Sequence, residues 1–107
     1  MNPVRHSRRV DFGRVNATAL RILPVILGRL IPDGRIIGAE YSARNPTRSD
    51  RHPGSFKINI RTGRWSDFAT GDRGGDPVSL AAYLENVPQP QAARLLGRIL
   101  GIDAEQA

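Results

Sequence analysis

Alternation of apolar and polar residues between Phe56 and Arg61 constrains the fold more than any other feature of this sequence. The run reads FKINIR, and a period of two is typical of a strand that buries one face. Thr62-Gly63 follows as a turn, and the segment WSDFA follows as a second strand. Residues 55–69 are therefore predicted to form a β-hairpin.

The turn type decides the register of this hairpin. A two-residue type I′ turn would place the β-branched Thr62 at positive φ, whereas a type I turn with Gly63 as the left-handed bulge residue avoids that strain. The other register would bury Asp67 together with Trp65, and a buried, unpaired carboxylate is costly. We therefore expect the bulged turn, with these pairs: Phe56 with Phe68, Lys57 with Asp67, Ile58 with Ser66, Asn59 with Trp65 and Ile60 with Arg64.

An apolar helix is predicted over residues 16–31, where leucines recur at helical spacing. Asn16 or Thr18 is its expected N-cap. Pro24 lies inside the stretch and should kink or split the helix, because proline removes a backbone donor. Pro32-Asp33-Gly34 ends it.

A helical pair is predicted over residues 76–101. Asp76-Pro77 has the residues favoured at an N-cap and at the first helical position, and Gly101 favours a C-terminal stop. Residues 35–43 are predicted to form a further strand, so the sheet covers residues 35–69 with about three antiparallel strands. The predicted fold is a single α+β domain over residues 16–107, with one N-terminal and two C-terminal helices.

Composition excludes several classes of protein. The chain has 107 residues, enough for one small domain, and no cysteine, so neither a disulfide nor a cysteine-ligated zinc ion is expected. It has no apolar run long enough for a membrane span and no secretory signal, so we expect a cytoplasmic protein and no membrane partner.

Charge indicates a polyanionic partner. The chain has 16 Lys and Arg against 10 Asp and Glu, and residues 1–64 alone hold 13 basic and 4 acidic residues. A basic half on a small domain favours nucleic acid as the ligand. Residues 1–15 are predicted to be a flexible basic arm, because they are polar and lack an apolar period.

The predicted nucleic-acid site combines cations with an aromatic ring. The bulged register places Trp65 beside Lys57 and Arg61, and such a face can neutralise phosphates and stack bases of a single strand. The alternative for Trp65 is a place in the core. The full set of candidate nucleic-acid-binding residues is Arg44, Arg48, Arg51, Lys57, Arg61, Arg64 and Trp65.

Catalysis, cofactors and metal are not expected. Two histidines without a cysteine make a nucleophile–base pair difficult to build, so we expect no enzyme. Asp67, Asp72 and Asp76 could hold Mg²⁺, but ion pairing, a turn and a helix cap are the ordinary roles of such residues. The glycine-rich segment 70–76 could bind a phosphate, although a tight turn explains it better.

Three motifs between Ile36 and Leu84 carry a family resemblance. They are Asn45-Pro46-Thr47-Arg48, Pro53-Gly54-Ser55-Phe56 and Gly75-Asp76-Pro77-Val78, the last within the run GRWSDFATGDRGGDPVSLAAYL. This segment resembles the zinc-ribbon domain of bacterial and phage or plasmid DNA primases, especially degenerate versions from mobile elements. The resemblance implies a zinc-ribbon-like sheet that contacts template DNA and does not itself make primer.

The family's metal ligands are replaced in this chain. Asn45 and Arg48 stand at the first two ligand positions, and Asp67 and Asp72 stand near the second pair, so the resemblance implies a relative without zinc. In that case Arg48 and one of the aspartates would form a salt bridge in place of metal bonds.

Two functions therefore follow from the sequence. The first is a non-catalytic module that binds nucleic acid, expected to be single-stranded DNA, in DNA replication or a mobile genetic element. The second is a protein-interaction or regulatory module that uses the apolar residues 20–31 to bind a primase, a helicase, a polymerase or a second copy of the chain.

Overall fold

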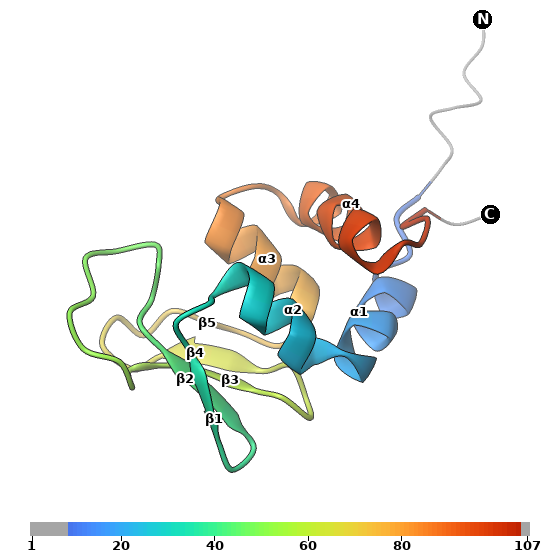
Figure 1. Ribbon diagram of the computed structural model, residues 1–107. Coiled ribbons are helices and arrows are strands. Elements are labelled where there is room, and N and C mark those ends of the chain that lie inside the picture. Colours follow the sequence, from blue (N-terminus) through green and yellow to red (C-terminus); the bar gives the residue numbers. More distant parts are fainter. Residues whose placement is uncertain (1–8, 106–107) are drawn as a thin grey trace, which may run out of the picture.

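The structure is a computed structural model and describes residues 9–105. Within this range, an antiparallel sheet lies on one side of the molecule and helices cover one of its faces (Figure 1). The sheet consists of β1 (Arg35–Ile37), β2 (Glu40–Ala43), β3 (Phe56–Asn59), β4 (Trp65–Asp67) and β5 (Arg73–Gly74), and its spatial order follows the sequence. The helices are α1 (Phe12–Arg21), α2 (Leu23–Leu30), α3 (Pro77–Glu85) and α4 (Gln89–Leu100).

The predicted α+β class with a small antiparallel sheet is confirmed, but the described residues contain five strands and four helices rather than three of each. The segment 35–43 is not one strand. It forms a hairpin in which Ile37 pairs with Glu40 across Gly38-Ala39. Gly38 has a φ of +63°, which matches the positive φ that a type II′ turn needs at its first central residue.

The N-terminal helix begins earlier than predicted. Asp11 is its N-cap, with Oδ1 accepting a hydrogen bond from the Arg14 backbone N at 3.0 Å. The predicted cap Asn16 instead lies within α1 and accepts a hydrogen bond from the Val78 N at 2.9 Å, which joins α1 to the start of α3. Of the predicted flexible arm, residues 1–8 lie outside the described residues and residues 12–15 are helical.

Pro24 splits the apolar stretch, as predicted. Ile22 leaves helical geometry with φ −129° and ψ 32°, and α2 then starts with Pro24 in its first turn. The missing N–H of a proline has no cost there, because the first N–H groups of a helix lack intrahelical partners.

The C-terminal helical pair is confirmed. Asp76 Oδ1 accepts from the Ser79 N at 2.8 Å in a capping box, and Pro77 takes the first helical position. Gly101 ends α4 with a φ of +74°. α3 and α4 pack against each other and against α1. No helix among the described residues is long and apolar enough to cross a membrane.

The predicted register of the β3–β4 hairpin is wrong. Phe56 pairs with Asp67 and Ile58 with Trp65, and the Asn59 N donates to the Arg64 O at 2.7 Å across a four-residue loop. This one-residue difference turns the β4 side chains to the opposite faces of the sheet. Trp65 and Asp67 therefore face the helices.

The core fills the space between the sheet and the helices. Phe56 and Ile58 are fully buried, and Trp65 is 5% exposed. The apolar stretch 20–31 contributes four buried side chains to this core: Leu23, Ile26, Leu27 and Ile31. The two ends of the described chain meet beside this core, where Val10 forms a β-bridge with Glu105.

Candidate nucleic-acid interface

One row of side chains crosses the sheet on the face that the helices leave free. The cross-strand pairs place these residues side by side in the order Arg35, Ser42, Lys57, Ser66 and Arg73, with one residue from each strand. Cations and hydroxyls alternate, so no two cations are direct cross-strand neighbours. This arrangement limits the repulsion that opposed like charges cause in a sheet.

A second row lies one pleat along the strands. It contains Ile37, Glu40, Asn59 and Arg64. Arg64 is exposed, and it adds a fourth cation to this surface. We call the two rows together with Phe68 the open face.

Phe68 extends the open face just beyond β4. Its backbone N donates to the Ser55 O at 2.9 Å, and its side chain is 72% exposed. Lys57 Nζ lies 5.9 Å from the centre of the phenyl ring, within the range of a cation–π contact. An exposed ring can stack on a base while the neighbouring cation binds the phosphate of the same nucleotide.

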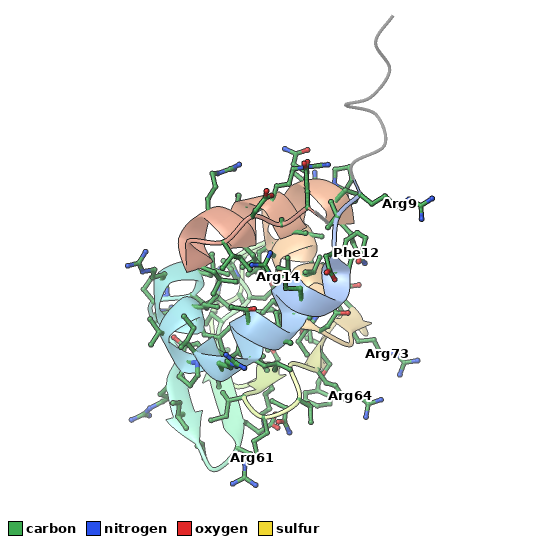
Figure 2. The ribbon with its side chains drawn as sticks, turned by 90° about the vertical axis from the view of Figure 1, so that its right-hand side faces the viewer. Arg9, Phe12, Arg14, Arg61, Arg64 and Arg73 are labelled. Carbon is green, nitrogen blue, oxygen red and sulfur yellow. The ribbon has the colours of Figure 1, made fainter. Side chains whose placement is uncertain are left out.

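The open face is hollowed rather than flat. A hollow of about 840 Å³ is lined by Lys57, Arg64, Phe68, Arg73 and Glu40, among other residues, and the backbone of Gly74-Gly75 borders it. Figure 2 shows Arg64 and Arg73 pointing away from the ribbon on the same side of the molecule. Among the described residues, the hollow therefore combines several cations, the exposed ring of Phe68, a small part of the buried Trp65 and one carboxylate.

The predicted site residues lie in three kinds of place: on the open face, exposed elsewhere on the surface, and in contacts on the helical side of the sheet. Lys57 and Arg64 lie on the open face. Arg61 is exposed in the β3–β4 loop and points outward in Figure 2, and Arg51 is exposed in the loop after β2. Arg44 is exposed as well, and its Nε lies 3.1 Å from Asp33 Oδ2.

Trp65 is not on the face of Lys57, contrary to the prediction. Its indole Nε1 donates to Ser79 Oγ at 3.0 Å, and its ring centre lies 4.7 Å from that of Tyr83. The indole is thus held between the sheet and α3. Its ring cannot serve as a stacking platform for a base on the open face.

Arg48 also lies apart from the open face, because it neutralises the fully buried Asp67. Arg48 Nε lies 2.8 Å from Asp67 Oδ2, and Nη2 lies 3.3 Å from Oδ1. The hydrogen bonds from Arg48 hold the pKa of Asp67 down at about 2, and the same contact raises the pKa of Arg48. Asp67 is therefore a paired carboxylate, and its hydrogen bonds offset the desolvation penalty that was expected to keep it out of the core.

Four polar residues from separate parts of the chain meet here: Asn45, Arg48, Asp67 and Asp72. Asn45 is 1% exposed and donates through Nδ2 to Asp67 Oδ2 and to Tyr83 Oη, both at 2.8 Å. Tyr83 in turn donates to Asp72 Oδ2 at 2.7 Å. This polar cluster joins the loop after β2 to β4 and α3, and every buried side-chain nitrogen and oxygen of the described residues has a partner.

The polar cluster differs in chemistry from a metal centre. Within residues 9–105, no three His, Cys, Asp or Glu side chains are grouped so that they could hold a metal ion. A guanidinium at one of the four positions also repels a cation. The cluster therefore acts as a set of hydrogen bonds and ion pairs.

Sequence reasoning missed Arg35, Arg73 and Phe68. The predicted bulged turn turned Phe68 to the wrong face, whereas Arg35 and Arg73 were missed because the hairpin within residues 35–43 and the strand β5 were not predicted. The signal that could have found them is the alternation of side chains along each strand. Once the strands are paired correctly, this alternation gives the residues that share a face with Lys57.

No family model, curated protein or solved structure matches this chain significantly. The candidate site is therefore defined by its own residues and their geometry.

Proposed function

We propose that this chain is a non-catalytic module that binds single-stranded nucleic acid through the open face. The observation that carries the proposal is the row in which Arg35, Lys57 and Arg73 alternate with serines, with the exposed Phe68 against Lys57. Cations that follow a phosphate backbone together with an aromatic ring for a base are the two parts that such binding requires.

The proposed context is DNA replication or a mobile genetic element. It rests on the motifs that resemble the primase zinc ribbon and on the way Asn45, Arg48, Asp67 and Asp72 gather in one polar cluster. In this proposal the cluster does the structural work of the zinc ion in that family, and the open face contacts the template strand.

A titration with a fluorescently labelled oligothymidylate at several salt concentrations tests the function. Binding should weaken with salt, and the plot of log K against log salt should have a slope of about −3, because four cations on a single strand release about 0.7 counterion each. An absence of binding at low salt would overturn the proposal.

A charge-matched pair of variants locates the site. Arg73→Gln removes a cation from the open face, and Arg98→Gln removes an exposed one from α4 on the helical side. We expect Arg73→Gln to weaken binding and to make the salt slope shallower by about 0.7, whereas Arg98→Gln should change little. Equal effects would place the ligand elsewhere.

A protein-interaction function is the second candidate, favoured by two exposed residues. Ile22 and Val25 remain 42% and 60% exposed, whereas Leu23, Ile26, Leu27 and Ile31 of the same stretch are buried. The molar mass of the chain in solution tests whether this surface joins two copies. A dimer that Val25→Asp converts to a monomer would support it, and a monomer at all concentrations would argue against self-association.

A further inference from the structure

Among the described residues, Glu40 is the one carboxylate that lines the hollow of the open face. It stands at the start of β2, opposite Asn59 of β3, and the hollow also contains Lys57, Arg64 and Arg73. A carboxylate repels phosphate, so its presence opposes binding of the nucleic-acid backbone. A contact with another part of the ligand would offset this cost.

Glu40 stands without a side-chain partner in the part of the chain that the structure describes. Among residues 9–105, its side chain forms no ion pair or hydrogen bond, although it is half-buried. Glu85, which is exposed at the end of α3, is the other described carboxylate without a partner. The remaining described carboxylates cap helices, accept hydrogen bonds or form ion pairs: Asp11, Asp33, Asp50, Asp67, Asp72, Asp76, Asp103 and Glu105.

Phe68 and Glu40 lie at opposite ends of the open face. Phe68 is joined to Ser55 and Glu40 to Asn59, and these two partners are four residues apart on one strand segment. At about 3.3 Å per residue, the separation is roughly 13 Å, with Lys57 between them. One nucleotide cannot reach both ends, so the face offers two neighbouring base positions.

We propose that Glu40 gives the open face a preference for bases that carry an exocyclic amino group. A carboxylate accepts hydrogen bonds from the amino group of cytosine, adenine or guanine. Thymine and uracil have no exocyclic amino group, and their imino N3–H lies between two carbonyl oxygens that would face the negative charge of Glu40. The position at Phe68 tolerates every base, because each one has a face that can stack.

This inference rests on the proposed function, and a comparison of two pyrimidine oligonucleotides tests it. Oligodeoxycytidylate and oligothymidylate of equal length carry the same backbone charge. The unaltered protein should bind the cytidylate about tenfold more tightly, which is the size of one good base contact. If both bind equally, the inference falls while the proposed function stands; if neither binds at low salt, both fall.

Two charge-matched variants assign the preference to its residue. Glu40→Gln should tighten binding of the thymidylate and bring the ratio of the two affinities close to one, because the repelling charge is gone. Glu85→Gln makes the same change of charge on α3 and should leave the ratio as it is. A preference for cytidylate that survives in Glu40→Gln would overturn the role of Glu40.

Discussion

Arg48 holds the buried Asp67 through two contacts, Nε to Oδ2 at 2.8 Å and Nη2 to Oδ1 at 3.3 Å. The pair explains the strand register, because it lets a carboxylate face the helices beside Trp65. The side chain of Asp67 is wholly inaccessible to solvent, whereas that of Arg48 is 30% exposed. The stability of the hairpin therefore depends on a residue in a loop that precedes it.

Replacing Arg48 by methionine should destabilise the domain strongly. A fully buried carboxylate that loses its ion-pair partner costs about 3–5 kcal/mol. Urea denaturation followed by Trp65 fluorescence would measure the loss. Arg44→Met is the matched control, because its pair with Asp33 is about half exposed and should contribute no more than about 1 kcal/mol. Similar losses in both variants would contradict the role of the buried pair.

Stability should fall in acid as Asp67 becomes protonated. A carboxyl group whose pKa is lower in the folded chain stabilises the fold above its unfolded pKa, and this contribution is lost as the pH falls toward the folded pKa. The shift of Asp67 from 3.8 to about 2 corresponds to roughly 2 kcal/mol. We expect the urea midpoint to decrease from about pH 5 to pH 2. In Asp67→Asn the midpoint should be lower at neutral pH and change less in acid.

Replacement by alanine should destabilise the domain at Gly74, in β5, and have no effect at Gly75, the next residue. A Cβ at Gly74 would collide with the indole of Trp65 and lie 2.6 Å from Ser79 Oγ, whereas a Cβ at Gly75 would meet no atom within 4 Å. Gly74→Ala should therefore cost about 1–3 kcal/mol and shift the emission of Trp65. Gly75→Ala should leave both unchanged, and thermal denaturation would compare them.

Phe68→Ala should weaken binding without affecting the fold. The ring is 72% exposed, so little core packing is lost, whereas stacking on a base contributes about 1–3 kcal/mol. Anisotropy with the labelled oligothymidylate should show at least a several-fold loss of affinity. Trp65 emission should be the same in the variant and the unaltered chain, because the indole packs on the helical side. Unchanged affinity would remove Phe68 from the interface.

Local signals predicted the two C-terminal helices well. Asp76-Pro77 lie at the start of α3, and Gly101 lies at the end of α4. Each acts within one turn of its own helix, so the sequence pattern alone places the start of α3 and the end of α4. The start of α1 was missed because Asp11 and the first helical turn lie in a polar, basic stretch that shows no apolar period.

The hairpin register could not be predicted in the same way. The register argument treated Asp67 as unpaired, although the family resemblance implied a salt bridge from Arg48 to Asp67 or Asp72. Strand alternation does not identify this partner, because Arg48 lies 19 residues earlier in the chain. The wrong register also changed the predicted site, because a shift by one residue turns every side chain of β4 to the opposite face of the sheet. The alternation within β3 alone placed Lys57 on the correct face. The predicted register placed Trp65 on that face and Phe68 on the opposite one, which is the reverse of the structure.

The bridge between Val10 and Glu105 determines how the domain can be attached to anything else. The Asp11 N donates to the Ala104 O at 2.8 Å, so the chain enters and leaves at one pole, on the helical side in Figure 1. A tether, a fused domain or a solid support joined directly to the ends of the described residues 9–105 would therefore be attached on that side, with the open face directed away from it. The same closeness makes the domain suited to circular permutation, with new ends opened in a surface loop.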